Sequence, residues 1–567
     1  MKIFSIIFLL CAFILFASNN FIPISQITPG MNGYGKTVFK GTKIEKFNIE
    51  VLGVLKNSKF SDKLVINGQS VLVKTYGKQI EKNGGIAAGM SGAPIYIKGK
   101  LLGALSAGWT LTDHSVGIVT PINEMMKLTY PPYMNIGTGE IGIGLLDKPV
   151  KLNGKTFIGL APESMKNHKY SNLLYFHYCN SPLMISGLNS KSITISNNTF
   201  NTISTSELPE NTLIKRLEPG AAIGVQLARG DVNITSLGTL TYYDKDRNIV
   251  LAFGHPFLHK GKVDYFLSGA YIYYTFSSID MPFKVGAPLG ILGSVIQDRE
   301  QGIVGIIRRK TKEIPLKLIV KDDDHNITRI INVSIVKDYQ VLSDILTALS
   351  KQSLDETINK VGSMSIKSYF NIGYSVGKIK QYFKYENLFF TDNPAEIVSQ
   401  DLLDTINKLI DNEYSPISIN NIDWQLNVTE KRKTARIINV KLPNREVSPG
   451  EVIGINVTIK PFRQEKFVKT IFIKLPKNAG PSLNLIVEGG HNFRNSTEEK
   501  ENFASLDQLV TIISDFPQNN EIIIRWTQNS DPSNAETDKI DNSSPFAKKI
   551  ISGYVLDGYF ENILVFK

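Results

Sequence analysis

Short stretches in which apolar and polar side chains alternate recur along most of this chain. Residues 47–51 (FNIEV) and 453–459 (IGINVTI) place every second side chain on one apolar face, which is the period of a strand with one buried face. Glycines and prolines separate these stretches, as turns require. Because 42% of the residues are hydrophobic and 20% are charged, the chain can bury a substantial core. We therefore predict a mainly β protein with several domains.

Changes in the pattern divide the chain into segments. Helical spacing of apolar residues occurs at 338–361 and 394–414, and evenly spaced short strands after residue 417 are typical of an immunoglobulin-like sandwich. The predicted segments are a signal peptide or N-terminal anchor (1–20), a serine-bearing β segment (21–130), a connecting or inserted module (131–215), a histidine-bearing β segment (216–340), a helical connector (341–416), an immunoglobulin-like β-sandwich (417–490) and a C-terminal β tail (491–567).

The first 20 residues, MKIFSIIFLLCAFILFASNN, place a lysine before an apolar run and end in small and polar residues. This pattern predicts a signal peptide or an uncleaved anchor, so we expect export to the periplasm, the cell envelope or the extracellular space, with membrane contact only through this segment. Cys11 lies inside it, which leaves Cys179 without a disulfide partner. The net charge of +11 is spread without long basic runs, so we expect no nucleic-acid partner.

A glycine-rich turn, GMSGAP at residues 89–94, presents a single hydroxyl group. Glycine admits backbone angles that a β-carbon forbids, and acyl transfer needs a reachable nucleophile with backbone N–H groups aimed at the developing oxyanion. Ser91 is therefore a candidate nucleophile, and the N–H groups of Gly89 and Ser91 are candidate oxyanion donors. The strand, tight turn and strand that follow would hold the serine on a β frame, unlike the helix that follows the nucleophile in α/β-hydrolases. The alternative is a plain turn in a β-hairpin.

His255 is the histidine best placed to act as a general base. An apolar strand at residues 249–253 ends in Gly254-His255-Pro256, and a base needs fixed geometry together with a pKa near neutrality. The alternative is a histidine that caps the end of a strand. His114, close to Ser91 in the sequence, competes for the same role but reads as part of a polar loop.

The two motifs together resemble a known family. GGIAAGMSGAPIYIKGKLLGALS resembles the active-serine segment of the SpoIVB-type serine peptidases, and GTLTYYDKDRNIVLAFGHP resembles their histidine segment. The resemblance extends over about residues 21–130 and 216–340. It implies a serine endopeptidase with a chymotrypsin-like double β-barrel, in which Ser91 is the nucleophile, His255 is the base and the backbone of Gly89, Met90 and Ser91 forms the oxyanion hole.

The chain departs from the family pattern in two respects. Ser91 precedes His255, whereas the family's histidine segment comes first, so the barrel segments would be in permuted order. The family's acid position is occupied by Tyr76, and loss of the acid of a triad can lower the rate by about 10⁴. The carboxylates that could substitute are Glu81, Asp113, Asp231, Asp244 and Asp264.

Two functions follow from these observations. The first is an exported serine endopeptidase that acts on a protein or peptide substrate, either its own chain or a protein of the envelope. The second is a catalytically inactive, peptidase-like envelope protein that serves as a binding module or scaffold.

We expect no cofactor and no metal. A G-x-G-x-x-G pattern at residues 137–142 lacks the surrounding strand and helix of a dinucleotide site. The run DDDH at residues 322–325 reads as a hairpin turn between two strands, and no H-E-x-x-H or paired C-x-x-C pattern is present.

Overall fold

The computed structural model describes two compact units. Unit 1 contains the described residues up to Glu313 together with Val333–Asp344, and unit 2 contains Ile314–Asn332 and Ile345–Lys567. The fold is mainly β with a closed barrel, as predicted. The described residues are 20–56, 59–61, 64–65, 69–109, 113–130, 144–152, 154–162, 172–188, 192–206, 208, 216–358, 362–477, 481–496, 504–528 and 548–567.

The predicted N-terminal segment lies, except for residue 20, outside the described residues, and so does the G-x-G-x-x-G pattern at 137–142. Within the part of the chain that the structure describes, no helix combines the length and the apolar character needed to cross a bilayer.

The first half of unit 1 forms a ring of paired strands. β1 pairs with β2 and β6, β6 with β7, β7 with β8, β8 with β5, and β5 with β2, so the pairings return to their start. Phe47, Ile49 and Val51 of β2 all point into its core, as their alternation predicts. We call this the first ring; its strands are β1 (Asn32–Val38), β2 (Ile44–Lys56), β5 (Ser70–Tyr76), β6 (Pro94–Ile97), β7 (Lys100–Gly108) and β8 (Val116–Pro121).

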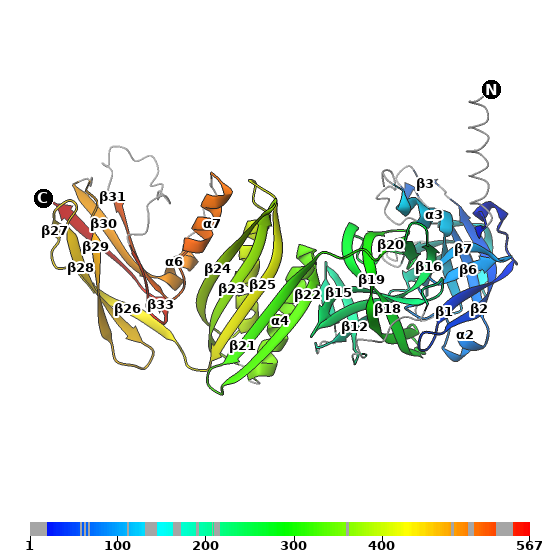
Figure 1. Ribbon diagram of the computed structural model, residues 1–567, viewed down its shortest axis with the longest axis horizontal. Coiled ribbons are helices and arrows are strands. Elements are labelled where there is room, and N and C mark those ends of the chain that lie inside the picture. The colour runs from blue at the N-terminus through cyan, green and yellow to red at the C-terminus, as the bar shows by residue number, and fades with distance from the viewer. Residues whose placement is uncertain are drawn as a thin grey trace, which may run out of the picture. The chain divides into compact units, whose positions relative to one another are not determined.

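The short elements around the first ring are η2 (Ile24–Gln26), β3 (Lys59–Ser61), β4 (Leu64–Val65), α2 (Lys78–Lys82), α3 (Ile122–Met126) and η3 (Lys127–Thr129). Figure 1 shows α2 close to β2, and the Gln79 side chain of α2 donates to the Glu45 carboxylate of β2 at 2.9 Å. The loop from α2 to β6 carries Ser91.

The region predicted as a connecting module contributes strands to both halves of unit 1. β9 (Gly144–Leu152), β10 (Lys155–Pro162) and β11 (Leu173–Tyr178) run from β2 to β7. β12 (Leu183–Ser186) then pairs with β16, β14 (Asn198–Ser204) pairs with β12, and β13 (Ser192–Ile195) pairs with β14. The residues between β11 and β12 therefore pass from one half to the other.

The second half of unit 1 forms another ring. β15 pairs with β16, β16 with β17, β17 with β20, β20 with β19, β19 with β18, and β18 with β15. The strands of this second ring are β15 (Ala222–Gly230), β16 (Asn233–Asp244), β17 (Ile249–Ala252), β18 (Gly261–Phe276), β19 (Phe283–Arg299) and β20 (Gly302–Ile307). His255 lies in the turn that follows β17.

Unit 2 begins with a sheet and two helices. β25 pairs in parallel with β21 and antiparallel with β23, and β23 pairs with β24 (Figure 1). The elements are β21 (Glu313–Asp322), β23 (Met364–Val376), β24 (Ile379–Thr391), α5 (Pro394–Ile410) and β25 (Ile417–Thr429), together with β22 (Ile327–Val336) and α4 (Tyr339–Ile358), which also contribute the residues Val333–Asp344 of unit 1. Both helices occur where apolar spacing predicts them, but the hairpin of β23 and β24 between them was not predicted.

The C-terminal part of unit 2 consists of two sheets with one apolar core. The first sheet has the order β29-β28-β26-β33 and the second has the order β27-β34-β30-β31-β32. The strand that opens the predicted sandwich, β25, belongs to the preceding sheet, whereas strands of the predicted tail complete both sheets. The elements are β26 (Thr434–Lys441), β27 (Glu446–Val447), β28 (Val452–Pro461), β29 (Phe467–Lys474), β30 (Ser482–Gly489), α6 (Gly490–Ser496), α7 (Leu506–Asp515), β31 (Glu521–Gln528), β32 (Lys548–Ile551), β33 (Val555–Asp557) and β34 (Tyr559–Phe566).

Candidate functional site

The serine turn (residues 86–93) and the histidine turn (residues 253–258) meet in unit 1. A β-carbon on Gly92 would lie 1.9 Å from the carbonyl oxygen of Thr239 and 2.5 Å from the backbone nitrogen of Phe253. Gly92 also has a φ of +90°, so only glycine fits without strain. Since Ser91 adjoins Gly92 and His255 follows Phe253 by two residues, the fold brings together the two segments that the sequence singled out.

The second ring holds the serine turn through strand β16. The backbone N–H of Thr239 donates to the carbonyl oxygen of Ser91 at 2.7 Å, and the Thr241 hydroxyl donates to that of Gly92 at 2.8 Å. The Thr239 hydroxyl also donates to the carbonyl oxygen of Gly89 at 3.1 Å. The position of Ser91 therefore depends on both rings.

Ser91 lies inside the protein, at 0% exposure, and its Oγ has no hydrogen-bond partner among the described residues. Two of the three candidate oxyanion donors are occupied: the Gly89 N–H donates to the carbonyl oxygen of Cys179 at 3.2 Å, and the Met90 N–H donates to that of Ala87 at 2.8 Å. The Ser91 N–H has no partner in the described chain. The Gly89 N–H already binds a carbonyl oxygen, which is the type of group that an oxyanion hole receives.

His255 is also fully buried and has a defined tautomer. Its Nδ1 lies 2.7 Å from the carbonyl oxygen of Pro256, and because a carbonyl can only accept, Nδ1 carries the proton. Nε2 therefore holds the lone pair, and it has no partner among the described residues. Burial lowers the pKa of His255 to about 4, so the ring is neutral at pH 7. This is the protonation state that a general base acting through Nε2 requires, but the pKa lies well below the near-neutral value predicted for an efficient base.

The backbone just before His255 is strained. Phe253 has a φ of +67° and Gly254 a φ of +73°, and a bulky residue in the left-handed region costs about 1–2 kcal/mol. The Phe253 ring fills the space beside Gly238, where an added β-carbon would lie 2.2 Å from Phe253 Cε1. Strain of this kind persists where the surroundings fix it, often at functional sites.

Tyr178, at the end of β11, covers His255. The two rings stack with centroids 5.1 Å apart and an interplanar angle of 25°. The Tyr178 hydroxyl donates to the carboxylate of Glu300, and burial raises the pKa of Glu300. Glu300 is thus connected to His255 through an aromatic ring, not by a direct hydrogen bond.

Asp298, the other acidic residue near the histidine turn, supports its backbone. Its carboxylate accepts hydrogen bonds from the N–H groups of Phe257 and Leu258, each at 2.7 Å. The sequence did not single out Asp298 or Glu300. Their only local signal is a pair of acids at the end of an apolar strand, and that pattern usually marks a turn.

The five carboxylates predicted as substitutes for the acid are not hydrogen-bonded to His255, because Nδ1 binds Pro256 and Nε2 has no described partner. Tyr76, at the family's acid position, is 38% exposed and donates its hydroxyl to Asn32 Oδ1 at 3.3 Å. The five lie elsewhere in unit 1: Glu81 in α2, Asp113 before β8, Asp231 between β15 and β16, Asp244 at the end of β16 and Asp264 in β18.

Among the described residues, the His114 ring hydrogen-bonds to backbone carbonyls, and its own carbonyl oxygen accepts from the Ile86 N–H at 2.7 Å. Its Nδ1 lies 2.9 Å from the oxygen of Trp109 and its Nε2 lies 3.1 Å from that of Ile279. It therefore makes no hydrogen bond to Ser91.

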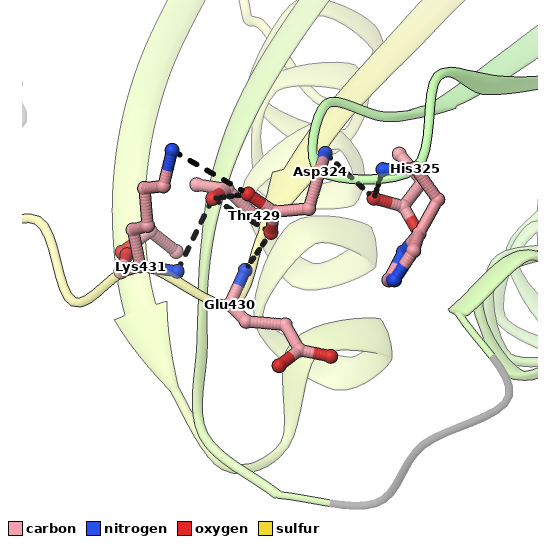
Figure 2. Close-up of polar contacts among 7 residues, drawn as sticks. Asp324, His325, Thr429, Glu430 and Lys431 are labelled. Atoms are coloured by element: carbon pink, nitrogen blue, oxygen red, sulfur yellow. Dashed lines mark hydrogen bonds and ion pairs between the residues drawn. The ribbon is translucent and has the colours of Figure 1, made fainter.

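The run at residues 322–325 is a hairpin turn, as predicted, and its acids hold that turn together. Figure 2 shows the Asp324 carboxylate accepting hydrogen bonds from the Thr429 hydroxyl, at 2.9 and 3.0 Å, and from the Glu430 N–H at 2.6 Å. Asp322 bonds to Nδ1 of His325 at 2.8 Å. No cluster of three or more potential metal-ligating side chains occurs among the residues that the structure describes.

Comparison with known families gives one match. Residues 20–126 match the sequence model of a family described as SpoIVB peptidase S55. The match includes the serine turn but not His255. No curated protein and no solved structure gave a match. Over residues 20–126, a segment that contains Ser91, the chain is therefore similar to the SpoIVB peptidase S55 family.

Proposed function

We propose that this protein is an exported serine endopeptidase of the SpoIVB type, with Ser91 as the nucleophile and His255 as the general base. In this proposal the two rings form a double barrel of the chymotrypsin kind, with the serine-bearing segment first in the chain. The observation that carries the proposal is the meeting of the two turns at Gly92 and Phe253, together with a His255 tautomer that leaves Nε2 unprotonated.

The chemistry follows from these groups. Nε2 of His255 takes the proton of Ser91 Oγ while Oγ attacks a peptide carbonyl carbon, and the ring then returns the proton to the leaving amine. The Ser91 N–H supports the developing oxyanion, and the Gly89 N–H joins it when the Cys179 carbonyl withdraws. Water hydrolyses the acyl-enzyme by the same route.

A carbonyl oxygen takes the place of the triad acid. The Pro256 carbonyl orients the His255 ring through Nδ1, but it carries no full charge to stabilise an imidazolium. Loss of the acid lowers the rate by about 10⁴ in a related triad. We therefore expect slow turnover, which suits processing of a specific protein better than general digestion.

Substrate entry requires a movement. Ser91 and His255 are both fully buried, with the Tyr178 ring against the histidine and the Cys179 carbonyl on the Gly89 N–H. A substrate carbonyl would replace that of Cys179. The substrate class is an extended peptide segment, either from this chain or from an envelope protein.

The burial of the pair also favours a second candidate function. A peptidase-like domain that no longer cleaves, and that serves as an envelope binding module or scaffold, needs neither an accessible Ser91 nor a carboxylate on His255.

Incubation of the purified full chain with an unfolded protein such as reduced casein separates the two functions. The peptidase produces fragments of the casein or of itself, and both Ser91→Ala and His255→Ala abolish them. An absence of fragments from the folded wild type, or equal fragments from all three proteins, supports the binding module.

A further inference from the structure

Lys284 is a buried cation beneath the serine turn. It lies near the start of β19 at 0% exposure, and the described residues give it no ion pair. Its backbone N–H donates to the carbonyl oxygen of Ala88 at 2.9 Å. A β-carbon on Gly89 would lie 3.2 Å from both Cβ and Cδ of Lys284, so the lysine side chain packs directly against the turn.

A buried amine without a carboxylate partner is unfavourable, because removing the charge from water is costly. Burial alone lowers the pKa of Lys284 to about 7. A methionine would fill similar space without this penalty, so packing does not explain the amine. Its hydrogen bonds do.

A chain of hydrogen bonds joins the amine to the serine turn. Nζ of Lys284 donates to Thr37 Oγ1 at 2.7 Å, and Thr37 Oγ1 lies 3.2 Å from Thr239 Oγ1. Thr239 uses its one hydroxyl proton on the carbonyl oxygen of Gly89. Thr239 must then accept from Thr37, and Thr37 must accept from Lys284, so the whole chain has one direction.

Protonation of Lys284 enforces this direction. An ammonium group has three donors and no acceptor, so Thr37 can only accept from it. A neutral amine has a lone pair. Thr37 can then donate to Nζ and Thr239 can donate to Thr37, which releases the Gly89 carbonyl oxygen.

We propose that Lys284 is a positioning residue that holds the Gly89–Met90 peptide, immediately before Ser91, through the hydroxyls of Thr37 and Thr239. The role deepens the proposed function and rests on it for its effect on reactivity. The protonated amine holds the turn in the arrangement described here, and the neutral amine loosens it.

The surroundings contribute no opposing charge. The serine turn has no titratable side chain. Thr239 of β16 is joined to the amine through Thr37, and Thr275 of β18 is the cross-strand partner of Lys284. On β1, the nearest cation is Lys36, whose ammonium lies 5.2 Å from the centre of the Tyr96 ring. The titratable residue that adjoins the serine turn is His114, whose carbonyl oxygen accepts from the Ile86 N–H at 2.7 Å. A step near neutral pH is therefore assigned to Lys284 only if Lys284→Met removes it.

The test measures the rate at which a fluorophosphonate labels Ser91 in the full chain between pH 5 and pH 9.5. Because His255 stays neutral above about pH 4, its titration adds no step in this range. Wild-type labelling should fall above pH 7, by at most about tenfold for each pH unit, until it reaches the rate of Lys284→Met. Lys284→Met should label slowly with no step near pH 7, Thr239→Val should behave similarly, and Lys36→Met should match the wild type.

Equal rates and equal pH profiles for wild type and Lys284→Met would overturn the proposal. The Lys284→Arg variant keeps its charge at pH 9. If it labels as fast at pH 9 as at pH 6, the proposal is supported. If Lys284→Met does not fold, Thr37→Val and Thr239→Val replace it in the test, and both should label slowly with no step near pH 7.

A second measurement keeps this proposal separate from the proposed function. If wild-type Ser91 is not labelled at any pH, the peptidase proposal fails. Hydrogen exchange of residues 86–93, corrected for the intrinsic rate at pH 6 and pH 8.5, then decides the role of Lys284. Protection that falls at pH 8.5 in wild type but not in Lys284→Met supports it, and pH-independent protection in wild type refutes it.

Discussion

Replacing Gly92 with alanine tests whether the two turns meet as described. The added β-carbon would lie 1.9 Å from the Thr239 oxygen and 2.5 Å from the Phe253 nitrogen. Both contacts are to backbone atoms, which cannot rotate away as a side chain can. The turn must therefore separate from β16, from the histidine turn, or from both.

The size of the effect follows from what is lost. The φ of +90° at Gly92 costs a non-glycine residue about 1–2 kcal/mol. Separation from β16 breaks the bonds from Thr241 Oγ1 to the Gly92 oxygen and from the Thr239 N–H to the Ser91 oxygen, and each buried group left unpaired costs about 1–3 kcal/mol. We expect Gly92→Ala to destabilise unit 1 by about 3 kcal/mol or more.

Gly99 provides the matched control. It has a φ of +76°, and an added β-carbon there would meet nothing within 4 Å, so Gly99→Ala should cost only the conformational term of about 1–2 kcal/mol. Urea unfolding followed by hydrogen-exchange mass spectrometry measures the free energy of unfolding from peptides of unit 1 separately from those of unit 2. A loss in Gly92→Ala no larger than that in Gly99→Ala would refute the close approach of the two turns.

Three further outcomes follow from buried polar groups. In the unfolded chain His255 takes up a proton near its ordinary pKa, whereas the buried side chain does so only near pH 4. Acidification from pH 7 to pH 4 therefore favours unfolding, and unit 1 should lose about 3 kcal/mol of stability that His255→Gln does not lose. Urea unfolding at the two pH values measures this loss. Tyr178→Phe leaves the Glu300 carboxyl without its hydroxyl partner and should lower stability by about 1–3 kcal/mol; a double variant with Glu300→Leu that is no more stable than the single variant would contradict this. In unit 2, Arg494 pairs with buried Asp401 at 3.1 Å, so Arg494→Met should cost about 3–5 kcal/mol, and adding Asp401→Asn should recover part of that loss in the same urea assay.

The strands were predictable because their signal is local. Residues 453–459 alternate in sequence, and Ile453, Ile455, Val457 and Ile459 are all buried in the same core. The sheet that each strand joins depends on contacts far along the chain. β25 shows this: it reads like its neighbours in sequence but pairs with β21 and β23.

The candidate site was predictable in part. Ser91 and His255 are conspicuous because glycine and proline occur in the turn that holds each of them, which is visible in the sequence. The acidic residues were not, because Glu300 reaches His255 only through the ring of Tyr178, and these three residues are distant in sequence. The burial of the pair also could not be predicted, since it depends on where the end of β11 lies.

Lys284 is distinguished in the sequence by its surroundings. It is a single cation in the otherwise uncharged run MPFKVGAPLGIL, residues 281–292. Such a residue on a strand usually faces solvent. Its role depends on hydroxyls from β1 and β16, which no local pattern reveals.

The most direct test of the central claim is whether Ser91 is an activated nucleophile. The full chain, Ser91→Ala and His255→Ala would each be treated with a fluorophosphonate at pH 6.5, and the modified residue identified by mass spectrometry of peptides. The proposed peptidase predicts a label on Ser91 in the wild type and none in either folded variant. An unlabelled wild type, or labelling of Ser91 that persists in His255→Ala at the wild-type rate, would contradict the proposal that this pair performs catalysis.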